Sequence, residues 1–220
     1  MSFEGFPDQG LVFYEGLEAD NSKTYWTAGR ADYEAHVRAP MTALVEALAP
    51  EFGPAKVFRP YRDVRFSHDK TPYKTHQGAV VVQEGRGAGS WYVQISADGL
   101  TVSGGCWRLE SDQVARYRRA VADDVQGPRL EAEMARLRAA GWEIEGDRLV
   151  RVPAGFSADD DRIELLKHRS LYATRHWTPQ DWLHTPAALD RVRTGWHDLA
   201  ALNTWFAENV GATTKEPRRR

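Results

Sequence analysis

The residues best suited to chemistry lie in one short segment, Lys56–His76, which reads KVFRPYRDVRFSHDKTPYKTH. The segment contains six lysine and arginine residues and two aspartates. Its formal charge is therefore +4 (six minus two), in a chain whose total charge is −2. The rest of the chain therefore carries −6, so this basic excess is not ordinary surface charge. Such a cluster indicates either a site for an anionic group or ion pairs to acidic residues elsewhere.

The side-chain types in this segment suit a phosphate, carboxylate or sulfate group. Arginine binds planar anions through paired hydrogen bonds, and lysine supplies a point charge. We expect Arg62 and Arg65 to be the main anion ligands, with Lys70 and Lys74 as secondary cations. The other predicted members of the ligand-binding site are a further cation, two hydroxyl groups that complete it and two carboxylates that orient the arginines: Arg59, Ser67, Tyr73, Asp63 and Asp69.

Local geometry leaves two interpretations of the segment open. Pro60 and Pro72 prevent a continuous helix and favour an extended connection. In an extended chain Asp63 and Arg65 lie on the same side, so the carboxylate can hold the guanidinium through a two-pronged ion pair. The segment is therefore either an anion site or a structural network of arginine–aspartate pairs, and long connections in compact proteins are often functional.

The same segment carries a resemblance to a known family. The strings RDVRFS, DK and PYK, at residues 62–67, 69–70 and 72–74, resemble the hallmark of a family of conserved hypothetical proteins known as domain of unknown function 2461. Weaker matches, such as Gly104-Gly105 and Gly155-Phe156, extend the resemblance over most of the chain. It implies a stand-alone cytoplasmic protein with a single α+β domain, and the charged string as its site. It implies no reaction, substrate or cofactor, and no catalytic residue.

Cysteine and histidine offer weaker candidates. The single cysteine, Cys106, excludes an internal disulfide, and its place on an apolar strand face predicts a small core residue. His68 beside Asp69 is the best metal-binding candidate, but the seven histidines form no helical pair or close cluster. We therefore expect no metal site, and the sequence assigns no cofactor.

Composition excludes several classes of protein. A net charge of −2 argues against a nucleic-acid-binding protein that depends on bulk charge. The longest aliphatic run, Ala79–Val82, is far too short to cross a membrane. Glu4 and Asp8 occupy the place of the apolar stretch of a signal peptide. We therefore expect a cytoplasmic protein without a membrane partner.

Helices are expected around this segment in the sequence. Residues spaced three and four apart predict a buried helix face before it, with a kink or restart at Pro40: Tyr33, Val37, Met41, Leu44, Val45, Leu48 and Phe52. The clearest element is one long C-terminal helix from Pro186, capped by Thr185 and ended by Gly211.

Strands are expected after the segment. Residues 91–97 and 100–107 predict a hairpin with a type I′ turn at Asp98-Gly99. Its second face is polar and either floors a pocket or is simply solvated: Tyr92, Gln94, Ser96, Thr101 and Ser103. A smaller hairpin is expected over 142–152, and a strand over 171–177. Near this strand, a second cationic group either completes the anion site or marks an exposed strand edge: Arg169, Arg175 and His176.

Together these patterns predict an α+β protein: an antiparallel sheet with a central Asp-Gly hairpin, packed by several helices. We expect one domain over residues 1–211 and a mobile basic tail over 212–220. The predicted function is binding of a small anionic molecule at the charged loop. The alternative is a non-enzymatic interaction module whose charged loop is an ion-pair network. No nucleophile–base pair is visible in the sequence, so it assigns no enzymatic reaction.

Overall fold

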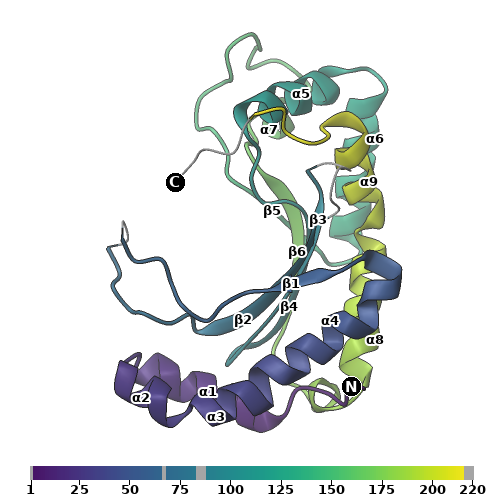
Figure 1. Ribbon diagram of the computed structural model, residues 1–220. Coiled ribbons are helices and arrows are strands. Elements are labelled where there is room, and N and C mark those ends of the chain that lie inside the picture. The colour runs from purple at the N-terminus through teal and green to yellow at the C-terminus, as the bar shows by residue number, and fades with distance from the viewer. Residues whose placement is uncertain (1, 66–67, 83–87, 216–220) are drawn as a thin grey trace. The chain divides into compact units, whose positions relative to one another are not determined.

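The computed structural model describes residues 2–65, 68–82 and 88–215, and Figure 1 shows their arrangement. Within these ranges the chain forms helices and a six-stranded antiparallel sheet with the strand order β1-β2-β3-β4-β6-β5, which confirms the predicted α+β class. The described helices include none long and apolar enough to cross a membrane. The chain divides into two compact units: Met1–Val81, Tyr92–Val102 and His176–Gly195 form the first, and Val82–Trp91, Ser103–Arg175 and Trp196–Arg220 the second.

The first unit begins with helices, as predicted. They are α1 (Asp8–Ala19), α2 (Lys23–Ala28), α3 (Arg30–Tyr33), the π-helical turn η1 (Glu34–Arg38) and α4 (Ala39–Phe52). All seven residues of the predicted apolar face, from Tyr33 to Phe52, are buried. The predicted interruption at Pro40 is also confirmed, because the π-helical turn ends at Arg38 and Pro40 lies in the first turn of α4. This position suits proline, which has no N–H to donate.

The strands are β1 (Ala55–Val57), β2 (His76–Val82), β3 (Ser90–Ser96), β4 (Gly99–Cys106), β5 (Glu143–Glu145) and β6 (Leu171–Trp177). β1 runs antiparallel to β2, with Lys56 opposite Val80. The predicted alternation along β3 is confirmed, because Trp91, Val93 and Ile95 are buried. Because side chains alternate along a strand, the side chains between these buried ones point to the opposite face of the sheet, where the polar residues lie.

The central hairpin is present, but its turn lies one residue earlier than predicted. Ala97 and Asp98 form the turn, and Gly99 is already the first residue of β4. No described non-glycine residue has a positive φ, whereas Gly99 has a φ of +117°. A type I′ turn needs two positive φ values, so the single left-handed residue excludes it. Glycine suits the place, since a Cβ there would clash with the carbonyl oxygen of Trp177.

Two further elements differ from the prediction. The long C-terminal helix is two helices, α8 (Ala187–Asp198) and α9 (Ala200–Asn209), separated at Leu199, whose ψ of −2° departs from helical geometry. The small hairpin over 142–152 is absent from the described residues. Its first part, β5, pairs with β6 instead, and residues 148–152 contribute one bridge, between Arg148 and His168. Periodicity within a segment does not determine which distant strand it joins.

The remaining helices are η2 (Asp181–His184) in the first unit and α5 (Ser111–Ala122), α6 (Gln126–Ala139) and α7 (Ile163–Leu166) in the second. The predicted tail begins at residue 212, but the structure ties its first part to α5. Thr213 Oγ1 and Thr214 N donate hydrogen bonds of 2.8 and 2.9 Å to the carboxylate of Asp112. Residues 216–220 lie outside the described ranges.

The charged segment forms a hairpin extension of β1 and β2, described over residues 58–65 and 68–75, which we call the arm (Figure 1). Its two sides are joined by the bonds Lys74 N–H to Pro60 O, 2.8 Å, and Arg62 N–H to Pro72 O, 2.9 Å. Tyr61 lies opposite Tyr73 in an antiparallel bridge between them. The arm is therefore an irregular ribbon, and its side chains alternate between two sides.

The turn between α1 and α2 anchors the arm. The Asn21 side-chain amide donates to Tyr73 O and accepts from Tyr73 N, both at 3.1 Å, as a neighbouring strand would. The Tyr73 ring stacks on Trp26 with ring centroids 4.4 Å apart and planes at 9°. At the base of the arm the Tyr33 hydroxyl donates to buried Gln77 Oε1 at 2.6 Å. These contacts fix where the charged side chains of the arm lie.

We predict that Asn21→Ala lowers the free energy of unfolding by about 1–2 kcal/mol, because both backbone groups of Tyr73 lose a partner. Hydrogen exchange at the Tyr73 amide should accelerate. Denaturant titration and exchange mass spectrometry measure the two effects. Thr27→Ala in α2 is the control, since its hydroxyl makes one exposed bond to Lys23 O. Equal losses in the two variants would contradict the anchoring role of Asn21.

Candidate functional site

At the tip of the arm, the predicted pair between Asp63 and Arg65 is confirmed. Arg65 Nε and Nη2 donate to the two Asp63 carboxylate oxygens at 2.9 and 2.7 Å. This hydrogen bonding and the aspartate's charge raise the pKa of Arg65. The guanidinium side chain keeps 66% of its surface exposed. An exposed pair of this kind adds little stability, but its carboxylate neutralises the arginine locally.

The second aspartate of the arm folds back onto Arg62. Arg62 Nη1 donates to Asp69 Oδ2 and also contacts the Thr71 hydroxyl. The Thr71 N–H, followed by Arg62, lowers the pKa of Asp69 to about 2. Lys70 Nζ donates to Val64 O at 2.9 Å. Both predicted orienting carboxylates therefore engage arginines, and Ser67 lies outside the described residues.

The predicted ligand Tyr73 lies elsewhere. Its ring is 6% exposed and packs on Trp26, on the side of the ribbon opposite Lys74. Its neighbour across the ribbon, Tyr61, is 47% exposed, with its ring centroid 5.6 Å from that of Tyr73. Tyr73 thus contributes to the packing of the arm. Charge interactions connect four other groups at the base of the arm and the start of β2.

These four groups, Arg59, Arg62, Lys74 and His76, form what we call the cation cluster. Half-buried Lys74 places its ammonium 5.0 Å from the centroid of the Phe58 ring. Among the described residues, no carboxylate oxygen lies within 4.0 Å of Arg59, Lys74 or His76. The one carboxylate held within the cluster is that of Asp69, on Arg62. Three fixed cations and one carboxylate give the cluster a formal charge of +2 before any contribution from histidine.

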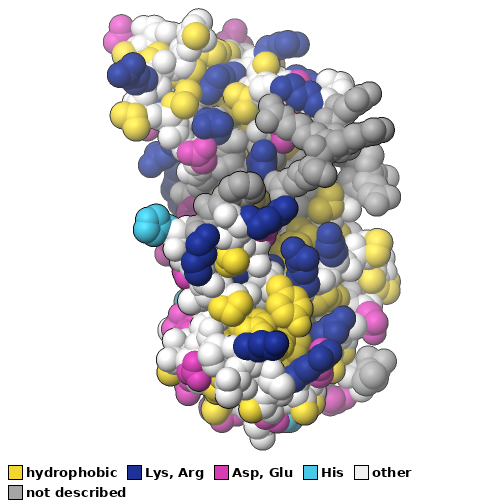
Figure 2. All heavy atoms as spheres, turned by 60° about the vertical axis from the view of Figure 1, so that its left-hand side comes forward, with side chains coloured by type: hydrophobic (Ala, Val, Ile, Leu, Met, Phe, Trp, Pro, Cys, Tyr) yellow, Lys and Arg dark blue, Asp and Glu magenta, His cyan; other side chains and the backbone are white. Residues whose placement is uncertain are grey.

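The surroundings of Lys74 and His76 disfavour the charged forms of these two side chains. Burial, and then the charge of Arg59, lowers the pKa of Lys74. Burial, followed by the charges of Lys74 and Arg62, lowers the pKa of His76. Both shifts mean that the charged form is less stable here than in water. An anion placed among these groups would reverse both effects. Lysine and arginine side chains also gather around a hydrophobic patch on the face shown in Figure 2.

Sequence reasoning named three of the four members of the cation cluster but not His76. It weighed His76 only as a flanking histidine of the charged string. The spacing could have indicated His76, because Lys74 lies two residues before it and side chains two apart in an extended chain share a side. This spacing is informative only once it is known that β2 begins at His76 and that Phe58 lies opposite Gly78.

A hollow lies on the polar side of the central hairpin, within the first unit. We call it the sheet pocket. Its volume is about 470 Å³, and it is lined by Gln94, Ser96, Ala97, Asp98, Thr101, His176, Thr178 and Pro179. The Thr101 hydroxyl lies 3.1 Å from His176 Nδ1. Asp98, His176, Thr178 and Pro179 of this lining are exposed, so the polar face is solvated and also floors an open pocket.

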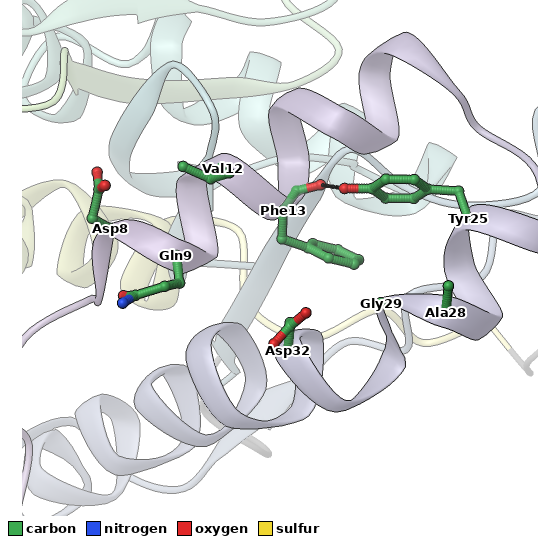
Figure 3. Close-up of a pocket in the computed structure, with 8 residues that line it drawn as sticks. All are labelled: Asp8, Gln9, Val12, Phe13, Tyr25, Ala28, Gly29 and Asp32. Carbon is green, nitrogen blue, oxygen red and sulfur yellow. Dashed lines mark hydrogen bonds between the residues drawn. The ribbon is translucent and has the colours of Figure 1, made fainter.

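A second hollow of about 480 Å³ lies among α1, α2 and α3 (Figure 3). Its wall includes the Phe13 ring, and the Tyr25 hydroxyl donates to Phe13 O at 2.9 Å. The charged groups that line it are carboxylates, Asp8 and Asp32, and Figure 3 shows the Asp32 side chain directed toward the Phe13 ring. Its charge disfavours an anion, so it is not a candidate for the predicted ligand.

The other predicted reactive groups have structural surroundings. Cys106 is 1% exposed, and burial raises the pKa of its thiol to about 12, which confirms it as a core residue. In the described part of the chain, no three His, Cys, Asp or Glu side chains lie close enough together to hold a metal ion. The cation cluster and the sheet pocket are thus the candidate sites.

Comparison with known proteins bears on identity but not on chemistry. No curated protein matches the chain. A family described as conserved hypothetical protein (DUF2461) matches residues 9–205, which include the arm, the cation cluster and the sheet pocket. The match spans most of the 220 residues, in agreement with the resemblance seen in the charged string. The chain therefore belongs to the conserved hypothetical protein family DUF2461.

Proposed function

We propose that the protein binds a small anionic molecule at the cation cluster. The observation that carries the proposal is the half-buried ammonium of Lys74, which has cations rather than carboxylates as its charged neighbours in the described structure. Partly buried charges in proteins are normally paired, because burial without a counter-charge is costly. A bound anion supplies that counter-charge.

The groups of the cluster suit a tetrahedral or planar anion. The contacts of Arg62 to Asp69 and Thr71 both use Nη1, so the rest of its guanidinium fork can meet a ligand oxygen. Arg59 is exposed, and Lys74 adds a compact point charge. A phosphate monoester carries about −1.5 to −2 at pH 7, which balances the formal +2 of the cluster.

The alternative, a structural ion-pair network, fits the tip of the arm alone. Asp63 engages Arg65 there, and Lys70 bonds to a backbone carbonyl. These contacts stabilise the conformation of the tip, and its two carboxylates are paired with arginines. They do not reach Lys74 or Arg59 among the described residues, so they leave the excess charge of the cluster uncompensated.

We predict that Lys74→Gln weakens binding of inorganic phosphate by about 10- to 100-fold, the loss of one hydrogen bond to a charged group. Isothermal titration calorimetry measures the affinity. Thermal unfolding gives a second readout, since a ligand at a hundred times its dissociation constant adds about 2.7 kcal/mol to wild-type stability.

The matched control is Lys70→Gln, which removes a lysine of the same arm whose ammonium bonds to Val64 O. Its affinity for phosphate should stay within about twofold of the wild type, since exposed charges are screened. Equal weakening in the two variants would mean that phosphate responds only to net charge and would contradict a site at Lys74.

A pH dependence follows from His76. Its pKa is lowered from 6.5 in the folded protein, so the unfolded chain binds more protons as the pH falls through that value. The free energy of unfolding should therefore decrease from pH 7.5 to 5.5. Sulfate, whose charge is constant over this range, should reduce the decrease at fixed ionic strength because it stabilises the protonated imidazole.

Denaturant titrations of the wild type and His76→Gln at three pH values measure this effect. The variant should lose the sulfate-sensitive part of the decrease. It should keep the part due to His168, whose pKa burial also lowers. A sulfate effect of the same size in His76→Gln would place the anion away from the cation cluster.

A further inference from the structure

The sheet pocket holds polar groups whose hydrogen-bonding capacity is not used by the described chain. Ser96 is 8% exposed, and its hydroxyl has no hydrogen-bond partner among the described residues. Gln94 accepts at Oε1 from the Tyr92 hydroxyl at 2.7 Å, which leaves its amide donors directed elsewhere. Asp98 lines the same pocket with an exposed carboxylate. The Ser96 oxygen is accessible from the pocket, where a ligand can pair with it.

The unused groups are a mixture of donors and acceptors. The Ser96 hydroxyl both donates and accepts, the Gln94 amide donates, and the Asp98 carboxylate accepts. No lysine or arginine lines the pocket. Hydroxyl groups match such a mixture because each can donate one bond and accept others, whereas an anion would be repelled by Asp98.

Contacts connect this pocket to the cation cluster within the first unit. Lys74 lies over Phe58, and the Phe58 and Tyr92 ring centroids are 6.3 Å apart. Tyr92 then donates to Gln94 in the pocket wall. Gly78 of β2 permits this arrangement, because a Cβ there would clash with the Tyr92 hydroxyl. Tyr92 and Gln94 are two residues apart on one strand, so both side chains lie on the side of the sheet that carries the pocket.

We infer that the anion bound at the cation cluster is the phosphate of a phosphorylated sugar or polyol whose hydroxyl groups occupy the sheet pocket. The inference rests on the proposed anion site and assigns it a ligand class. The pocket volume of about 470 Å³ lies in the range of small-molecule sites. The ligand's polar chain meets Ser96, Gln94 and Asp98, and its phosphate meets Lys74 and the two arginines of the cluster.

The test is calorimetry of the full chain with four probes: inorganic phosphate, ribose 5-phosphate, glucose 6-phosphate and gluconate. Ser96→Ala is the informative variant. Its hydroxyl makes no hydrogen bond among the described residues and is accessible from the pocket, so the substitution should not destabilise the free protein. Ser103→Ala is the matched control, because the Ser103 hydroxyl is similarly buried but lies 2.7 Å from the Thr174 hydroxyl and does not line the pocket.

At least one sugar phosphate should bind the wild type more than tenfold more tightly than inorganic phosphate. Ser96→Ala should weaken binding of that sugar phosphate roughly three- to tenfold, because one neutral hydrogen bond is lost. The affinity for inorganic phosphate should not change. Ser103→Ala should change neither affinity. Gluconate should bind more weakly than the sugar phosphates, since one carboxylate charge leaves part of the cluster unbalanced.

Four results would overturn the inference. If both sugar phosphates bind no more tightly than phosphate, the anion site stands and the sheet pocket is not part of it. If Ser96→Ala weakens the binding of phosphate and of sugar phosphate equally, or if gluconate binds most tightly of the four probes, the assigned ligand class is wrong. If none of the four probes binds, the proposed function fails together with the inference, and that outcome is distinct from the first three.

Discussion

The candidate site depends on how the arm is held. A two-stranded ribbon that leaves the edge of a sheet has few partners of its own and is marginally stable in water. Here Asn21 supplies the two hydrogen bonds that a third strand would make to Tyr73, and Trp26 covers the ring of the same residue. One side of the ribbon is thereby anchored to α2. The other side, with Lys74 and Phe58, is fixed as a consequence.

This anchoring gives the charges of the arm different roles. At the tip, Asp63 and Asp69 neutralise two arginines and shape the loop. Toward the sheet, no described carboxylate lies within 4.0 Å of Lys74 or Arg59, and burial, followed by the charge of Arg59, lowers the pKa of Lys74. A protein gains no stability from such an arrangement, so it fits a binding site better than a structural element. We therefore propose that the two interpretations that the sequence leaves open apply to different parts of one segment.

Local patterns in the sequence predict much of this structure. The buried face from Tyr33 to Phe52, the strand Leu171–Trp177 and the Asp63–Arg65 pair all depend on neighbours within a few residues, and all are confirmed. The site itself depends on distant contacts, which one sequence does not contain. No local pattern indicates that Tyr73 turns toward Trp26 or that the Ser96 hydroxyl has no hydrogen-bond partner among the described residues. The turn before Gly99 and the break at Leu199 were predicted wrongly, because tertiary packing determines them.

We propose that the cation cluster binds an anion. A crystal of the protein grown without multivalent anions and then soaked in arsenate, a phosphate analogue with a strong anomalous signal, tests this proposal. We expect an anomalous peak within hydrogen-bond distance of Lys74 Nζ and an arginine of the cluster, in molecules free of lattice contacts there. Arsenate bound elsewhere, or a carboxylate of the protein's own chain seated on Lys74 in the unsoaked crystal, would contradict it.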